Sequence, residues 1–153
     1  KGAPLKILAI VDEFTRECLA IKVETSIKAA DVVVTLNNLI EQRGAPLCIR
    51  SDNGSEFIAQ QVRSFLKQRG VQTLFIEPGA PWQNGYSESF NAKFSDELLK
   101  REIFTSMLEA RVVCEDWRHW YNQKRPHSAL NYSTPAAFAA STSTTDSHRS
   151  WTR

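Results

Sequence analysis

The chain has 153 residues, of which 42% are hydrophobic, so it is long and apolar enough to bury a core, and global disorder is excluded. No apolar run approaches the roughly 20 residues of a membrane span, and the first residues lack the apolar core of a signal peptide. The net charge of +2 indicates no partner by itself, and three widely separated cysteines indicate neither a disulfide framework nor a zinc site, so a cytoplasmic location fits best.

The first third of the chain predicts a hairpin, a helix and a strand. Two short apolar runs, residues 5–11 and 18–23, flank a polar turn, which is typical of an antiparallel hairpin. Apolar residues then recur at helical spacing over residues 29–40, and Gly44 follows as a stop. Residues 47–50 read as a short strand, and this strand–helix–strand order implies a crossover with parallel pairing.

The middle of the chain predicts a helix, a strand and a loop. The helix begins near Ser55, has one apolar face, and ends at Gly70. Residues 73–76 form a short strand. Residues 77–85 contain two prolines and two glycines and therefore form a loop.

Two further helices follow the loop. One opens near Ser87 and places apolar side chains at i, i+4 and i+8, namely Phe90, Phe94 and Leu98. Ser106 and Glu109 form a capping box for the last long helix. From residue 139 onward the chain is rich in serine and threonine, which favours a flexible tail over residues 139–153.

Residues 93–125 combine cations with aromatic rings. The cations are Lys93, Lys100, Arg101, Arg111, Arg118, Lys124 and Arg125, and the rings are Trp117, Trp120 and Tyr121. This combination suits a nucleic-acid surface. The alternative, more common for such a segment alone, is a solvated helix whose aromatic rings lie in the core.

Asp52 and Glu88 are the candidate metal ligands. Asp52 follows a buried strand, and α/β proteins place their sites at the carboxyl ends of parallel strands. Glu88 lies in the first turn of its helix. Helix capping explains Asp52 equally well, and the preference of acids for helix N-termini explains Glu88.

The spacing of these two carboxylates favours a shared site. They are 36 positions apart (88 − 52), and one helix, one strand and one loop lie between them. This path can return the chain to the strand end that it left. Two carboxylates at one sheet edge repel each other unless a cation bridges them, and hard cations such as Mg²⁺ prefer oxygen ligands. A two-metal site can clamp the attacking and leaving oxygens of a phosphodiester.

Three segments carry a resemblance to a known family: SDNGSEF (51–57), PWQNGYSESFN (81–91) and YNQKRPHSALNYSTPAAF (121–138). They resemble the integrase-core transposases of bacterial insertion sequences, which are similar to retroviral integrases. The resemblance covers roughly residues 5–138. It implies an α/β, ribonuclease H-like catalytic core over residues 1–138, with a mixed central sheet, helices on both faces, and the tail of residues 139–153 beyond it.

The resemblance also implies an activity. Asp52 and Glu88 are then the second and third carboxylates of a D-D-E triad that binds two Mg²⁺ or Mn²⁺ ions. The family cleaves transposon-end DNA and transfers the strand to target DNA, so DNA and further copies of the chain are the expected partners. Two alternatives stay open: a catalytically inactive fragment that binds DNA or a subunit, and a plain nuclease of the same fold.

The chain departs from the family pattern in two places. The first triad Asp lies on a first strand upstream of KILAIVDEFTR, so that strand and that Asp are expected to be missing, and the sheet incomplete or completed by a partner. Asp12 is the less favoured substitute, because its VDEFT context matches the second strand and turn. Seven residues after Glu88 the family often has Lys or Arg, whereas this chain has Ser95.

Further residues are expected to contact DNA or pack the last segment. The resemblance places a loop beside Glu88 near DNA, and phosphate contacts on the helices that follow. The expected DNA-binding residues are Gln83, Asn84, Asn91, Lys93, Lys124 and Arg125. His127 is not expected to bind a metal, because no second histidine lies near it in the sequence.

Overall fold

The computed structural model describes residues 4–51, 59–76, 85–142 and 150–153. The elements of the first half are β1 (Lys6–Asp12), β2 (Cys18–Glu24), α1 (Ala29–Arg43), β3 (Cys48–Ser51), α3 (Gln60–Gln68) and β4 (Gln72–Phe75). Those of the second half are α4 (Gly85–Phe94), a π-helical turn (Ser95–Leu99), α5 (Met107–Gln123), a 3-10 turn (Ser128–Leu130), α6 (Pro135–Ser141) and β5 (Ser150–Thr152). No helix in these ranges is long and apolar enough to cross a membrane.

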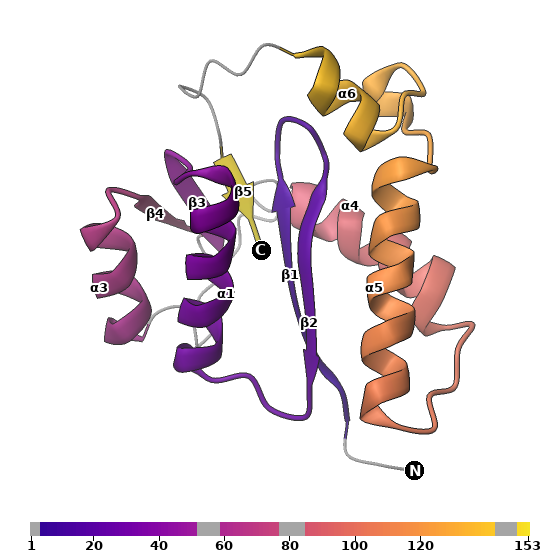
Figure 1. Ribbon diagram of the computed structural model, residues 1–153, viewed down its shortest axis with the longest axis horizontal. Helices are drawn as coiled ribbons and strands as arrows, with labels where there is room; N and C mark the ends of the chain where they lie inside the picture. The colour runs from indigo at the N-terminus through magenta and orange to yellow at the C-terminus, as the bar shows by residue number, and fades with distance from the viewer. Residues whose placement is uncertain (1–3, 52–58, 77–84, 143–149) are drawn as a thin grey trace.

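The strands form one mixed sheet in the order β2-β1-β5-β3-β4 (Figure 1). β1 and β2 are the expected antiparallel hairpin, with Lys6 opposite Glu24. β3 pairs in parallel with β4, and α3 connects them. The parallel pairing expected across the first helix is wrong: β2 and β3 are not neighbours, because β1 and β5 lie between them.

The centre of the sheet is completed by the C-terminal segment of the same chain. β5 is antiparallel to β1 and parallel to β3, with Trp151 opposite Asp12 on one side and Ile49 on the other. This is the central place, beside the hairpin, at which the resemblance puts the family's first strand. The expectation of an incomplete or partner-completed sheet is therefore wrong for this structure. Trp151 explains why, since its side chain is 1% exposed within the core.

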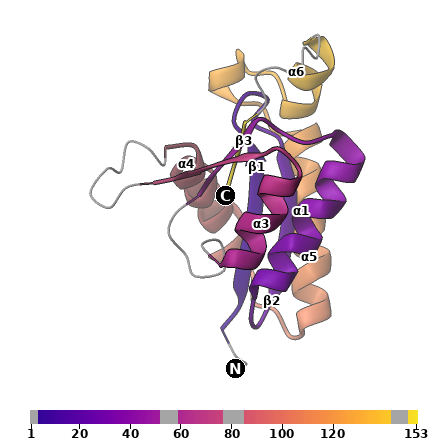
Figure 2. The ribbon, with the colours of Figure 1, turned by 90° about the vertical axis from the view of Figure 1, so that its left-hand side faces the viewer.

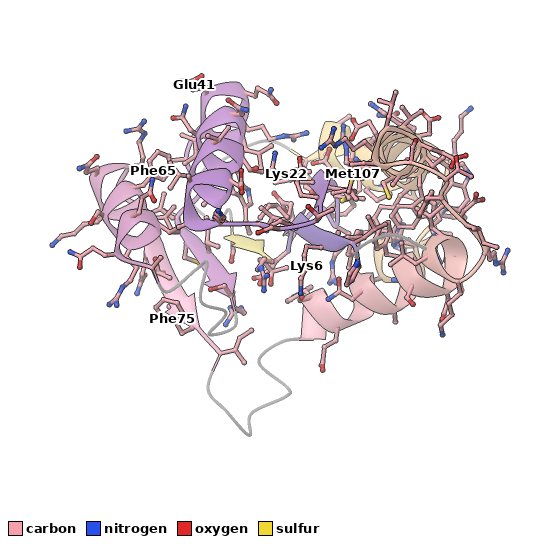
Figure 3. All side chains as sticks on the ribbon, turned by 90° about the horizontal axis from the view of Figure 1, so that it is seen from below. Lys6, Lys22, Glu41, Phe65, Phe75 and Met107 are labelled. Atoms are coloured by element: carbon pink, nitrogen blue, oxygen red, sulfur yellow. The ribbon has the colours of Figure 1, made fainter. Side chains whose placement is uncertain are left out.

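Helices cover both faces of the sheet, as expected for this fold class. α1 and α3 lie on one side and α4 on the other (Figures 2 and 3). The first core joins strand residues to the apolar faces of α1 and α3, including Leu36, Ile49 and Leu66. The second core holds four aromatic side chains, Phe90 and Phe94 of α4 and Trp117 and Tyr121 of α5. The sheet thus has two buried faces, and its functional groups must lie at its edges.

Local signals set most helix ends. Gly44 and Gly70 follow α1 and α3 with φ of 82° and 74°, a left-handed backbone that suits glycine. Ser106 Oγ accepts a hydrogen bond from the Glu109 amide at 3.0 Å and begins α5. α4 begins at Gly85, two residues before the expected start.

The segment after residue 138 has more structure than a flexible tail where it is described. Thr134 Oγ1 accepts a hydrogen bond from the Ala137 amide, and Pro135 occupies the first turn, so α6 extends to Ser141. The Phe138 ring packs edge-on against Phe14 of the hairpin turn, with 5.3 Å between centroids. Residues 150–152 form β5, whereas residues 143–149 lie outside the described ranges.

Candidate metal and nucleic-acid site

β3 delivers the chain to the position of the first candidate carboxylate. Its last residue, Ser51, is fully buried, and the Ser51 carbonyl accepts a hydrogen bond from the Ile76 amide at 2.8 Å. Asp52 follows directly but lies outside the described residues, as do Gln83 and Asn84. The strand end that precedes Asp52 is the carboxyl edge of a parallel pair, where α/β proteins place their sites.

The first turn of α4 is attached to this same edge. The Arg153 amide donates a hydrogen bond to the Arg50 carbonyl at 3.1 Å, which continues the β5–β3 ladder. The Arg153 carbonyl in turn accepts a hydrogen bond from Ser87 Oγ at 2.7 Å. Ser87 is 5% exposed, so this contact is buried. Two hydrogen bonds therefore connect the residue before Glu88 with the residue two before Asp52.

Glu88 itself faces solvent, whereas its neighbours hold the helix in place. Ser87, Phe90 and Phe94 are the buried residues of α4, and Glu88 is exposed between them. Asn91 is exposed one turn later, and its Nδ2 lies 3.4 Å from Ser87 Oγ. In the described ranges no group of three histidine, cysteine or acidic residues could hold a metal ion.

Asp12 lies away from the carboxyl edge of β3. Its Oδ1 accepts hydrogen bonds from the amides of Phe14 and Thr15, at 2.8 and 2.9 Å, so its carboxylate holds the hairpin turn. In the sheet Asp12 is level with Trp151 and Ile49, and Ile49 lies two residues before Ser51, the end of β3 (51 − 49), or about 7 Å along the strands. This geometry supports the interpretation of Asp12 as a structural residue.

The cationic segment is divided between structural and free cations. Four cations form ion pairs, with side-chain separations of 2.6–2.8 Å: Lys100 with Asp96, Arg111 with Glu24, Arg118 with Glu115, and Arg125 with Glu97. Trp117 and Tyr121 lie in the core, as the solvated-helix alternative predicts, whereas Trp120 is 43% exposed. Among the described residues of this segment, Lys93, Arg101 and Lys124 have no ion-pair partner.

A second cationic region, which the sequence did not indicate, lies along α4, the helix that carries Glu88. A cavity of about 450 Å³ is lined by the hairpin turn, α4, the end of α5 and the segment after it. Arg16, Lys93 and Arg125 all line it, although Arg16 is far from the other two in sequence. The Arg16 guanidinium lies 4.3 Å from the centroid of the Tyr86 ring. The sequence around Arg16 does not indicate a role in this site, because only the fold of the hairpin turn brings Arg16 close to α4.

His127 is the buried titratable group of this region. It is 4% exposed, and burial, reinforced by nearby Lys93 and Arg125, lowers the pKa of His127 to about 4. The ring packs edge-on against Tyr121, with 4.7 Å between centroids. His127 is therefore neutral at pH 7. Burial, together with the neighbouring Arg125, also lowers the pKa of Lys93.

The chain is similar to insertion-element proteins. It is 48% identical over 136 residues to a 39.2 kDa protein of insertion element IS476 from Xanthomonas euvesicatoria, covering 89% of this chain and 39% of that protein. It is 42% identical over 139 residues to a 31.7 kDa protein of insertion element IS407 from Burkholderia multivorans, covering 91% and 50%. The chain thus spans half or less of the length of these relatives.

Solved structures of the same fold include retroviral integrases. The catalytic core domain of the HTLV-2 integrase, solved with magnesium in a dimeric form, has a TM-score of 0.64 and 17% identity, covering 86% of this chain and 90% of that one. A simian T-cell lymphotropic virus intasome, solved with a PP2A regulatory subunit, has a TM-score of 0.66 and 14% identity, covering 92% and 54%. At these identities the likeness supports the ribonuclease H-like fold alone.

Two family models match the chain, and both describe an integrase core domain. One matches residues 1–81 and the other residues 69–135, so together they span nearly all the described elements. The insertion-element relatives agree with these matches. The chain therefore belongs to the integrase core domain family.

Proposed function

We propose that this chain is the catalytic core of a transposase that cleaves insertion-element DNA and transfers the cut strand. One observation carries the proposal: the Ser87–Arg153–Arg50 hydrogen bonds attach the start of α4 to the carboxyl edge of β3. The end of β3, which Asp52 follows in the sequence, and the first turn of α4, which carries Glu88, then belong to one edge of the sheet. Their spacing of 36 positions and the family membership support the same assignment.

The chemistry of these donors suits divalent cations. Carboxylate oxygens are the ligands that Mg²⁺ and Mn²⁺ prefer, and the exposed Glu88 can approach a metal without a buried ion pair being broken. Bound ions would stabilise the charge that develops on the phosphodiester oxygens during cleavage and strand transfer. Asp52 and Glu88 would hold and position these ions. Full activity in this proposal needs a third carboxylate, and Asp12 does not supply it, because its carboxylate caps the hairpin turn.

DNA would approach the edge at which Glu88 lies. The exposed Asn91 and the amine of Lys93 are on α4, whose first turn lies at this edge, and Gln83 and Asn84 precede α4 in the sequence. The exposed Lys124 follows the last residue of α5. Arg125 has a structural role, because its Nε donates a hydrogen bond to Oε1 of Glu97 and its guanidinium also donates to Oε2 of Glu97. Backbone contacts of this kind tolerate any sequence and weaken with salt. Further copies of the chain would be needed to hold two DNA ends.

Cleavage and joining of labelled insertion-element-end DNA in Mn²⁺ tests the proposal. The chain is assayed alone and as part of a longer protein that includes the residues upstream of Lys1. We expect joined products from the longer protein, their loss in Asp52→Asn and Glu88→Gln, and normal activity in Asp12→Asn if that variant folds. Cleaved products without joined ones would favour the nuclease, and DNA binding without either product would favour the inactive fragment.

A further inference from the structure

The cavity beside α4 has the features of a site that could bind an anion. Its volume of about 450 Å³ lies within the roughly 300–1,000 Å³ of ligand pockets. Three cations line it, and Glu97 neutralises only Arg125. Arg16 and Lys93 form no ion pair within the described ranges, so two positive charges at the cavity wall have no carboxylate in direct contact.

Polar atoms without partners are concentrated at the same wall. His127 Nε2 and Arg16 Nε are both buried, and neither has a hydrogen-bond partner in the described structure. Leaving a buried donor or acceptor unsatisfied costs about 1–3 kcal/mol, so such atoms are uncommon in folded proteins. Lys93 Nζ has only the hydroxyl of Ser89, at 3.3 Å, and Ser89 also lines the cavity. A ligand with oxygen acceptors would satisfy Arg16 Nε and Lys93 Nζ, and also His127 Nε2 in the tautomer that carries the proton on that atom.

The backbone around the cavity is strained in the way that ligand sites often are. Arg16 and Tyr132 have φ of 66° and 64°, a left-handed conformation that bulky residues rarely adopt. Both line the cavity, from segments more than 100 residues apart in sequence. Such strain persists where the surrounding structure requires it, and it is frequent at binding sites. Here it places an arginine and a tyrosine at one opening.

An aromatic surface lies beside the cations. The Tyr132 side chain is 75% exposed, and Tyr86, on the first turn of α4, is 38% exposed. Arg16 already covers the Tyr86 ring, so Tyr132 is the ring with a free face for a planar group. A cation pair next to an exposed aromatic ring is the arrangement with which proteins hold single-stranded nucleic acid, phosphate on the cations and base on the ring.

We propose that this cavity binds one nucleotide of a DNA strand, with its phosphate between Arg16 and Lys93 and its base stacked on Tyr132. The choice of DNA as the source of the nucleotide rests on the proposed function, whereas the phosphate and base contacts rest on the cavity alone. Lys93 lies five residues after Glu88 on the same helix. A nucleotide in the cavity would therefore fix one strand close to the metal site and set which phosphodiester reaches it.

Binding of a 5′-phosphorylated deoxythymidine trinucleotide to the chain, followed by amide chemical shifts, tests the proposal. We expect the largest shifts at Arg16, Lys93 and Tyr132. Lys93→Gln and Tyr132→Leu should each weaken binding about 5- to 100-fold, as expected for loss of a phosphate contact or a stacked base. Lys67→Gln is the matched control, since Lys67 is exposed on α3 and lines a different cavity. It should leave the affinity unchanged.

The outcomes separate the cavity from the catalytic proposal. No binding, or shifts at other residues, overturns the nucleotide site even where the chain cleaves DNA. Binding of inorganic phosphate as tight as that of the trinucleotide overturns the base contact. Trinucleotide binding in the cavity by a protein that never cleaves DNA supports the site and contradicts the transposase activity. The affinity of a variant is interpreted only if its amide spectrum has the same dispersion as that of the wild-type chain. The chemical-shift changes in the wild-type chain locate the bound trinucleotide without any variant.

Discussion

Trp151→Ala tests whether the C-terminal strand belongs in the centre of the sheet. The Trp151 side chain is 1% exposed and belongs to the core that β1, β3, α1 and α3 share. A buried tryptophan removes about 150–250 Å² from water, which at about 25 cal/mol per Å² corresponds to about 4–6 kcal/mol. Measured losses for large aromatic residues replaced by alanine are about 3–5 kcal/mol. We therefore expect the free energy of unfolding to fall by about 4 kcal/mol.

Urea denaturation followed by far-UV circular dichroism measures this loss without relying on tryptophan fluorescence. With a slope of about 2 kcal/mol per M, the midpoint should fall by about 2 M. Trp120→Ala is the matched control, because Trp120 is 43% exposed on α5, and its loss should be about 1 kcal/mol or less. Equal, small losses in the two variants would refute the reasoning and show that β5 leaves the sheet in solution.

Three further experiments test the site and its surroundings. Glu88→Gln should reduce DNA cleavage by more than about 100-fold, because loss of a metal ligand costs more than loss of the residues that orient the ligands, which is about 10–100-fold. The urea midpoint should not change, because Glu88 is exposed, and a lowered midpoint would instead indicate a structural role. Folding lowers the pKa of His127 to about 4, so only the unfolded chain gains a proton on this residue as the pH falls from 7 to 5. The free energy of unfolding should therefore drop by about 2 kcal/mol over that range. His127→Gln should lack this drop, and an equal drop in both proteins would contradict the lowered pKa. A double-mutant cycle of Glu97→Gln and Arg125→Gln should give a coupling of about 1 kcal/mol for this partly exposed pair, whereas additive losses would mean that Arg125 is free to bind DNA.

The hairpin, α1 and α5 were predictable because their signals are local. The hairpin follows from two short apolar runs, the end of α1 from Gly44, and the start of α5 from the Ser106 cap. Each signal lies within a few residues of the element that it predicts. β5 was not predictable, since three residues in a serine- and threonine-rich segment become a strand only through pairing with β1 and β3. The π-helical turn at Ser95–Leu99 had no signal either, although it keeps Leu98 buried with Phe94.

The candidate site was predictable in part. The motif spacing predicts Glu88 as a metal ligand, which stays a prediction, and hydrogen bonds through Arg153 connect the first turn of its helix with Arg50 near the end of β3. The cavity beside α4 was missed, because Arg16 reaches Lys93 and Tyr132 only through tertiary packing of the hairpin turn. The sequence overstated the cationic surface of residues 93–125, because most of these cations form ion pairs with acidic residues that only the fold reveals.

The most direct test of the metal site is Mn²⁺ titration followed by paramagnetic broadening of amide signals. The account predicts that broadening is strongest at Ser51 and at the first turn of α4, from Tyr86 to Ser89. Asp52→Asn combined with Glu88→Gln should abolish it, whereas Asp12→Asn should preserve it. Broadening centred on the hairpin turn, or unchanged in the double variant, would contradict a metal site built from Asp52 and Glu88.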